Sequence, residues 1–341
     1  SNKKLLDYFP EEFTPREQQV EVLKEIDKEI KKGTKYIVLN APTGFGKSAI
    51  SKTLANYSES PSENFVEWVN SYAAYSQDAY LDYPEFGCTA LTITKSLQDQ
   101  YWTDFPDGEV LKGKSNYQCM YDPDYDVEDA PCVSSPKLMR ECWGCNRCKY
   151  YNQRNVTLTN KFQILNYSMF LKLPDAVKNR QFMILDEASE IEDEIVKNFS
   201  INIHFEKLEK LGVDIQKISE DSKKSEVYGW LMDLLDELKF VIAEIKPLLS
   251  NKSSRMFKKN VVKYKILTRL MGNVEDIINV FSTSEYVVEE SEDGQSVTLT
   301  PLYIDKLTPA LFSHAKHVIL MSATIIDPNH FCKMLGIEKH K

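Results

Sequence analysis

Tyr36-Ile-Val-Leu-Asn-Ala-Pro-Thr-Gly-Phe-Gly-Lys-Ser48 is the most informative stretch of this sequence. Its first four residues form an apolar run rich in β-branched and aromatic side chains, which indicates a buried strand. A glycine-rich loop that ends in Lys-Ser follows, and residues 49–56 then have the pattern of a helix. This order of strand, glycine loop, Lys-Ser and helix is the context of a phosphate-binding loop.

The glycine loop offers the groups that a nucleoside triphosphate needs. Gly44 and Gly46 allow backbone N–H groups to turn towards phosphate oxygens, and the helix N-terminus adds partial positive charge. Lys47 would reach the β- and γ-phosphates, and the Ser48 hydroxyl would bind Mg²⁺. The alternative is an ordinary glycine-rich turn, but the flanking strand and helix favour a nucleotide site. The candidate ATP-binding residues of the loop are Ala41, Pro42, Thr43, Gly44, Phe45, Gly46, Lys47 and Ser48.

The bulk composition is that of a soluble globular protein, with 42% hydrophobic and 27% charged residues. At 341 residues the chain is long for one domain, so we expect two or three compact units. No apolar run approaches a membrane span and no signal peptide is apparent, so we expect no membrane and an intracellular location, either cytoplasmic (nucleoid-associated) or nuclear. The net charge of −9 argues against indiscriminate nucleic-acid binding, but it leaves room for a local basic groove along DNA.

Further predicted elements alternate along the chain. Residues 14–32 form an amphipathic helix that we expect to begin at Thr14-Pro15, with Arg16 and Gln19 in its first turn. Residues 57–86 are rich in aromatic side chains at loosely helical spacing and suggest a helical insertion; a stacking platform for bases is the less favoured alternative. Four more buried strands are predicted at Cys88–Ile93, Phe162–Asn166, Phe182–Leu185 and His317–Met321.

A change of character follows at residues 204–282, where long amphipathic helices are predicted. The flanking runs at 286–288 and 297–300 enclose Glu292-Asp-Gly-Gln, which is typical of a hairpin.

The cysteines are concentrated in one segment. Five of the seven fall within about thirty residues that contain little apolar periodicity of their own, and clustered thiols in a reducing compartment usually bind a metal. A Cys-x-x-Cys-x-x-Cys run with remote partners suits a [4Fe–4S] cluster, four thiolates equally suit Zn²⁺, and unrelated free thiols are the third interpretation. The candidate metal ligands are Cys119, Cys132, Cys142, Cys145 and Cys148.

A carboxylate pair follows the predicted strand at 182–185. Asp186 and Glu187 occupy the strand tip, which is the position of the second half of a nucleoside triphosphatase site. Asp186 would bind Mg²⁺ through water, and Glu187 would polarise the attacking water. With Lys47, these two residues are the candidate catalytic residues.

The ordered set of motifs resembles the iron–sulfur superfamily 2 helicases of the DinG/XPD type. About 135 residues separate the carboxylate pair from Ser322-Ala-Thr324, which is far longer than an ordinary connection in an α/β unit. The matching motifs are Ala41–Ser48 (motif I), Thr92–Gln100 (motif Ia), Lys112–Cys119, Cys148–Tyr151, Asp186–Ser189 (motif II) and Ser322–Thr324 (motif III).

The resemblance implies an α/β protein: a RecA-like motor domain with a parallel sheet, an inserted Cys-rich iron–sulfur domain and an inserted helical arch. It also implies ATP, Mg²⁺ and a [4Fe–4S] cluster as cofactors, and 5′–3′ movement on single-stranded or forked DNA, with Arg16 and Gln19 near the adenine. Thr94, Lys95, Lys112 and Lys114 would border the DNA path. The expected division is 1–105, 161–200 and 301–341 for the RecA-like domain, 106–160 for the cluster domain and 201–300 for the arch.

Three features depart from the family pattern. Ser189 replaces the histidine common at the fourth position of motif II, and five cysteines stand where the family uses four. The chain ends at Lys341, shortly after motif III, so we expect the second RecA-like domain in the full-length protein and little hydrolysis without it. Two other functions remain open at this point: a zinc-binding ATPase of the same class, and a non-catalytic single-stranded-DNA-binding or scaffold module.

Overall fold

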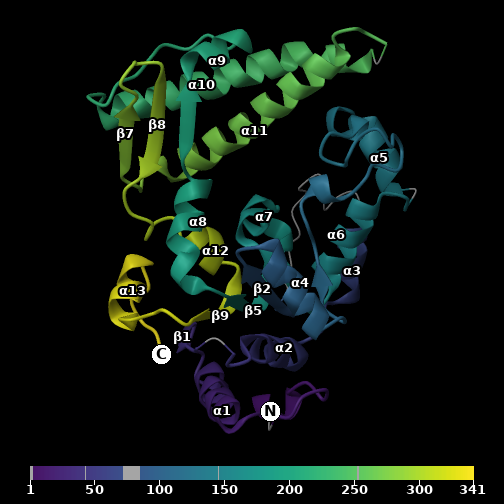
Figure 1. The fold of residues 1–341 in the computed structure, drawn as a ribbon, viewed down its shortest axis with the longest axis vertical. Coiled ribbons are helices and arrows are strands. Elements are labelled where there is room, and N and C mark those ends of the chain that lie inside the picture. The colour runs from purple at the N-terminus through teal and green to yellow at the C-terminus, as the bar shows by residue number, and fades with distance from the viewer. Residues whose placement is uncertain (1–2, 43, 72–84, 145, 252) are drawn as a thin grey trace. The chain divides into compact units, whose positions relative to one another are not determined.

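The computed structural model describes the chain except for residues 1–2, 43, 72–84, 145 and 252. The chain divides into two compact units: Ser1–Ile191 with Thr308–Lys341 form unit 1, and Glu192–Leu307 form unit 2. Each unit contains its own sheet (Figure 1). Each unit also has its own cluster of buried hydrophobic side chains. Within the described part of the chain, no helix combines the length and the apolar character that crossing a membrane requires.

Unit 1 is built on a six-stranded sheet in which all neighbouring strands are parallel. The strand order is β1-β9-β5-β2-β4-β3, so the last strand in the chain lies between the first strand and the fifth. The bounds are β1 (Tyr36–Asn40), β2 (Cys88–Thr92), β3 (Glu109–Val110), β4 (Phe162–Asn166), β5 (Arg180–Leu185) and β9 (Ala315–Ser322). This parallel sheet confirms the predicted α/β fold class.

The strands of unit 1 are short apolar runs because helices cover the sheet on both faces. Every residue of β2 is buried, and so are the last four residues of β5. The five longer strands are therefore recognisable from sequence. The two-residue β3 is too short to leave a pattern and was not predicted.

Helices α1, α2 and α4 contribute side chains to one continuous core cluster with β2, β4, β5 and β9. Helix α7 packs against β2 and β4. The helices of unit 1 are α1 (Glu17–Lys31), α2 (Lys47–Tyr57), α3 (Glu63–Asn70), α4 (Lys95–Asp104), α5 (Pro136–Gly144), α6 (Lys149–Thr159), α7 (Tyr167–Lys172), α12 (Pro309–Phe312) and α13 (Pro328–Met334). Its short 3₁₀ helices are η1 (Leu5–Tyr8), η3 (Lys114–Asn116), η4 (Pro131–Ser134), η5 (Asp175–Val177) and η6 (Ala188–Glu190).

Two of the predicted helical segments differ in extent from the helices that the structure describes. Helix α1 begins at Glu17 rather than at Thr14-Pro15, because Arg16 is its N-cap and the Gln19 side chain accepts a hydrogen bond from the Arg16 backbone N–H at 2.9 Å. Of the predicted insertion at 57–86, α3 is a helix, whereas residues 72–84 lie outside the described residues.

Unit 2 combines an antiparallel sheet with long helices. Strands β7 (Tyr286–Glu290) and β8 (Ser296–Pro301) form the predicted hairpin, and β6 (Ile201–His204), which was not predicted, pairs with β8 (Figure 1). Helices α10 and α11 pack along each other, and the apolar face predicted for α10 is buried. The helices of unit 2 are α8 (Ile191–Asn198, starting at the unit boundary), α9 (Phe205–Lys210), α10 (Lys224–Ile245), η7 (Lys246–Ser250) and α11 (Phe257–Phe281).

Candidate functional site

Three of the sequence motifs follow neighbouring strands of the unit 1 sheet. In the parallel register, Asn40 of β1 pairs with Ser322 of β9, and Leu185 of β5 pairs with Leu320 of β9. The glycine loop, the carboxylate pair and the Ser-Ala-Thr motif therefore emerge side by side at the carboxyl edge of the sheet. This edge is where ligands bind in open parallel sheets.

The glycine loop has the backbone that its sequence predicts. Gly44 and Gly46 have φ of 82° and 84°, in the left-handed region that glycine adopts at no steric cost. A Cβ on Gly46 would also collide with the side-chain amide of Gln19, so a larger residue here would be strained and would displace that amide from Phe45. Gly46 is the N-cap of α2, so the first backbone N–H groups of that helix are presented at the loop. Thr43 lies outside the described residues.

Arg16 and Gln19 are in contact with the glycine loop. The Arg16 guanidinium donates to the carbonyl of Gly44 at 2.9 Å, and the Gln19 amide donates to the carbonyl of Phe45 at 2.9 Å. Gln19 is buried, and its side-chain oxygen accepts from the Arg16 backbone. In this structure both residues thus shape the loop from helix α1. A role for them in recognising adenine stays a prediction.

Lys47 brings the two halves of the predicted site together. Its ammonium lies 3.4 Å from Asp186 Oδ1 and 3.0 Å from Glu187 Oε1, with only 13% of the lysine side chain exposed. Burial acts to lower the pKa of Lys47, but the carboxylates of Asp186 and Glu187 outweigh it, so the pKa lies above its ordinary value. Lys47 is therefore fully charged at neutral pH, and two carboxylates face its ammonium. In the nucleotide site that the sequence predicts, negatively charged phosphate oxygens would take the place of these carboxylates.

The carboxylate pair is fixed by an unusual backbone turn. Glu187 has φ of 50°, which is uncommon for a residue other than glycine. The turn places the Glu187 N–H 2.9 Å from Oδ1 of Asp186, and the Tyr167 hydroxyl donates to the Asp186 carbonyl at 3.0 Å. Such backbone strain is found where a site needs pre-organised side chains.

Helix α4 contributes two polar residues to the site that sequence reasoning missed. The Tyr101 hydroxyl donates to Asp186 Oδ2 at 3.0 Å, and the Ser48 hydroxyl donates to Asp104 Oδ2 at 3.2 Å. Burial, and then the charge of Asp186, raise the pKa of Tyr101 well above its ordinary value, so its hydroxyl keeps its proton. The only sequence signal was the i, i+3 spacing of Tyr101 and Asp104, which places them on one face of a helix.

The Ser-Ala-Thr motif also meets the carboxylate strand. The Ser322 hydroxyl donates to the Ser189 hydroxyl at 3.1 Å and lies 3.1 Å from the Thr324 hydroxyl. Ser189 stands where the helicases that the sequence resembles commonly have a histidine. The contact between the two motifs is thus made in this chain by two hydroxyl groups.

The described cysteines of the Cys-rich segment line one cavity of about 250 Å³. Burial raises the pKa of Cys132 to about 12, and Cys142, Cys119 and Cys148 add to the shift because their thiols are near. Cys145 lies outside the described residues. Among the residues that the structure describes, no three His, Cys, Asp or Glu side chains are arranged around a point that would hold a single metal ion.

The lysines predicted near DNA differ in their surroundings. Lys95 donates to Asn116 at 2.8 Å, and Lys112 pairs with Asp99 at 2.8 Å near the surface. The Lys114 ammonium instead lies 5.6 Å from the ring centre of Tyr150, and burial lowers its pKa. Lys112 and Lys95 are therefore better placed than Lys114 to meet a nucleic-acid backbone, and their role in DNA binding stays a prediction.

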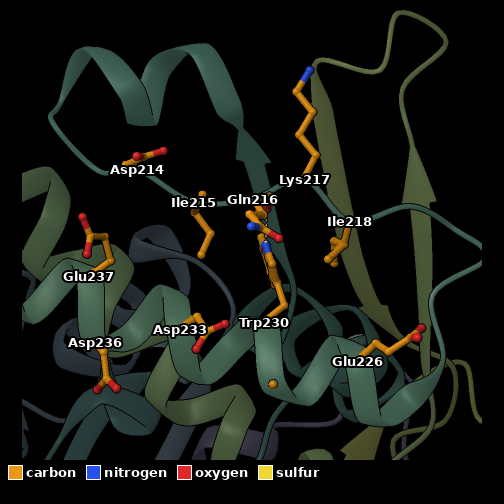
Figure 2. A pocket seen from close by; sticks show the side chains of 11 residues that line it. Asp214, Ile215, Gln216, Lys217, Ile218, Glu226, Trp230, Asp233, Asp236 and Glu237 are labelled. Atoms are coloured by element: carbon orange, nitrogen blue, oxygen red, sulfur yellow. Dashed lines mark hydrogen bonds between the residues drawn. The ribbon is translucent and has the colours of Figure 1, made fainter.

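Unit 2 contains a separate cavity of about 650 Å³ (Figure 2). Trp230 lines it and donates to the carbonyl of Gln216 at 2.7 Å. Carboxylates of Asp233, Asp236 and Glu237 on α10 line one side of it (Figure 2). None of the predicted site residues lines this cavity.

Comparison with known proteins gives one family and one fold. The family model that matches the chain is described as the res subunit of type III restriction enzymes, and it matches residues 12–213. The structure of an XPD helicase superposes with a TM-score of 0.55 over 96% of this chain, at 14% sequence identity. The chain spans 61% of the length of that helicase. A structure titled Truncated XPD matches with a TM-score of 0.47 and 13% identity, over 92% of this chain and 96% of that one. No curated protein matches the chain.

Proposed function

We propose that this chain, which belongs to the family of the type III restriction enzyme res subunit, is the ATP-binding motor part of a DinG/XPD-type DNA helicase. The observation that carries the proposal is the contact of Lys47, at the end of the glycine loop, with both Asp186 and Glu187. The fold shared with an XPD helicase agrees with it. A glycine-rich turn without a ligand-binding role would not require a lysine that is 13% exposed to contact two carboxylates about 140 positions further along the chain.

The phosphates of ATP would bind where Lys47 now meets the carboxylates. The Lys47 ammonium would exchange its ion pair with Glu187 for contacts with the β- and γ-phosphate oxygens, which attract it at least as strongly. The glycine loop and the α2 N-terminus would supply backbone N–H groups to the same oxygens. Glu187, released from Lys47, would then accept a hydrogen bond from the attacking water and orient it.

The oxygen donors beside the loop fit a magnesium ion. Ser48 and Asp186 would hold it, since Mg²⁺ prefers hydroxyl and carboxylate oxygens together with water and phosphate. When bound, Mg²⁺ neutralises negative charge on the phosphates during transfer.

The thiols around the 250 Å³ cavity fit an iron–sulfur cluster. The ligands of a cluster surround an extended body, each thiolate binding a different iron, whereas a zinc ion needs all of its thiolates about 2.3 Å from one point. We therefore propose a [4Fe–4S] cluster held by four of Cys119, Cys132, Cys142, Cys145 and Cys148, with Cys119 and Cys148 among the four, and leave Zn²⁺ as the alternative. Its role would be to order a segment that has few aliphatic residues of its own.

We extend the proposal to 5′–3′ movement on single-stranded or forked DNA, as the family resemblance implies. Helix α4 begins at Lys95 behind the Thr94 cap, whose hydroxyl accepts from the Leu97 N–H at 3.3 Å. A helix N-terminus with an adjacent lysine suits a backbone phosphate. The unwinding activity would belong to the full-length protein.

Nucleotide binding by the purified chain tests the proposal. We expect a fluorescent, non-hydrolysable ATP analogue to bind in the presence of Mg²⁺, and Lys47→Ala to weaken binding about tenfold to a hundredfold, because a hydrogen bond to a charged group contributes ~1.5–3 kcal/mol. Lys24→Ala, which removes an exposed lysine from α1, is the matched control. Equal affinity of Lys47→Ala and wild type would overturn the assignment. Binding of single-stranded DNA without any nucleotide binding would favour the non-catalytic module.

A further inference from the structure

Helices α2 and α4 are joined by a ladder of polar contacts beside the proposed nucleotide site. Ser48 and Ser51 lie one turn apart on α2, and Tyr101 and Asp104 lie one turn apart on α4. Ser48 donates to Asp104 at 3.2 Å, and Ser51 and Tyr101 have their hydroxyl oxygens 3.3 Å apart. The two helices therefore meet through paired side chains, and one pair includes the serine proposed to bind Mg²⁺.

The same face of α4 also reaches the second proposed magnesium ligand. Tyr101 is 3% exposed and donates to Asp186 Oδ2 at 3.0 Å. Its ring packs edge-on against Phe162 with the ring centres 6.2 Å apart, which limits where the hydroxyl can point. One helix thus contacts both proposed ligands, although they come from α2 and from the end of β5.

We propose that Tyr101 and Asp104 are positioning residues that orient the Mg²⁺ ligands Asp186 and Ser48, so that helix α4 determines the affinity of the site for Mg²⁺-nucleotide. The inference rests on the proposed function.

The chemistry of each contact supports this role. A hydroxyl group has one proton and two lone pairs. Since the Ser48 hydroxyl donates its hydrogen bond to Asp104, the lone pairs of its oxygen are left for a cation. Tyr101 fixes the Asp186 carboxylate by one oxygen, while the Glu187 N–H fixes it by the other at 2.9 Å. Hydrogen-bond partners that orient metal ligands in this way typically change metal affinity by about 10–100-fold when they are removed.

The charge of Asp104 adds a second effect. Its carboxylate accepts a hydrogen bond from the Ser48 hydroxyl, so only that hydroxyl separates it from the place where Mg²⁺ would bind. A nearby negative charge favours a divalent cation and disfavours a nucleotide that arrives without one. Removing the charge should therefore act on the magnesium dependence of nucleotide binding.

The test compares nucleotide affinity in Mg²⁺ and in EDTA. The fluorescent ATP analogue is titrated into wild type, Tyr101→Phe, Asp104→Asn and Asp104→Ala under both conditions. The quantity compared is the dissociation constant in EDTA divided by the dissociation constant in Mg²⁺. We expect this ratio to fall about tenfold in Tyr101→Phe and Asp104→Ala, and by less in Asp104→Asn, which keeps an acceptor for Ser48. The affinity in EDTA should not weaken, which separates positioning from general damage to the site.

Asp107→Asn is the matched control. Asp107 pairs with Lys52, so it joins the α2 helix to the residues just after α4 without touching either proposed ligand. This variant should keep the wild-type ratio. The inference is overturned if Tyr101→Phe and both Asp104 variants keep that ratio, or if Asp107→Asn lowers it equally. Should Asp104→Ala not fold, Tyr101→Phe and Asp104→Asn, which preserve side-chain volume, decide the outcome. A wild type that binds no nucleotide at all would instead overturn the proposed function.

Discussion

The hydroxyl of Ser322, at the end of β9, donates a hydrogen bond to the hydroxyl of Ser189 at 3.1 Å. This contact joins the residues after the carboxylate pair to the Ser-Ala-Thr motif, although 133 positions separate the two serines in the chain. A histidine at position 189 would have a larger, titratable ring at this contact. Two small neutral hydroxyl groups make it independent of pH over the physiological range.

Ser189→Ala tests whether this contact transmits the state of the nucleotide. We expect unchanged affinity for the ATP analogue and a loss of unfolding free energy of about 1 kcal/mol, as for one hydrogen bond. In the full-length protein, more ATP should be hydrolysed per base pair unwound. Ser200→Ala, which also removes one hydroxyl hydrogen bond, is the control. Unchanged coupling in Ser189→Ala would show that the contact is only structural.

His314 is expected to make the protein less stable in mild acid. Burial and then the charge of Lys178 lower its pKa to about 4, while Asp175 acts in the opposite direction. The unfolded chain takes up a proton near the ordinary value of 6.5, whereas the folded protein resists it until the pH approaches 4. The stabilisation is therefore complete above pH 6.5 and is lost as the pH falls from 6.5 towards 4.

Urea unfolding at pH 7 and pH 5 measures this effect. Wild type should lose more unfolding free energy between the two conditions than His314→Gln, whose amide still reaches the Asn179 partner of the histidine. His330→Gln, at an exposed histidine, should behave as wild type does. Equal losses in all three proteins would contradict the assignment. Asp175 does not contribute to the difference in unfolding free energy between pH 7 and pH 5, because its pKa is lowered from 3.8 and therefore lies below this pH range.

The cysteine assignment predicts which substitutions lose iron. Cys119→Ser and Cys148→Ser should each lose iron and sulfide after anaerobic purification, whereas one of Cys132→Ser, Cys142→Ser and Cys145→Ser should retain them, because four ligands fill the cluster. Metal binding and local folding form one equilibrium here, so each loss should also increase proteolysis between residues 107 and 151. Wild type that contains zinc and no sulfide would favour the alternative metal. Retention of a full cluster by both Cys119→Ser and Cys148→Ser would refute the assignment.

Lys112 is the lysine of its motif that we expect to meet DNA. Its ammonium pairs with Asp99 at a partly exposed position. Lys112→Glu should weaken single-stranded DNA binding and reduce the slope of log affinity against log salt by about one, as for the loss of one phosphate contact. Lys24→Glu makes the same charge change on exposed α1 and should have no effect. An unchanged salt slope for Lys112→Glu would remove this residue from the DNA path.

The local sequence pattern was sufficient to predict a structural feature wherever a physical constraint acts on residues that are close together in the chain. Gly44 and Gly46 were identifiable because only glycine adopts their φ values freely. The apolar face of α10 was identifiable because burial against one neighbour repeats with the helical period. The predicted start of α1 was wrong because an Arg16–Gln19 capping pair is a weaker signal than Thr14-Pro15. The two-residue β3 left too few residues for a pattern, and the exposed polar Asn202 and His204 interrupt the apolar run of β6.

The amino-acid sequence by itself determined the phosphate loop, the carboxylate pair, the five longer strands of the sheet and the concentration of thiols, since each is encoded in neighbouring residues. Only the tertiary structure decided which residues surround them. Tyr101 reaches Asp186 across 85 positions, and Ser48 reaches Asp104 across 56. Such partners depend on how β2 and α4 pack beside β5 and α2. That packing results from the burial of apolar area over the whole sheet, and no stretch of sequence contains it.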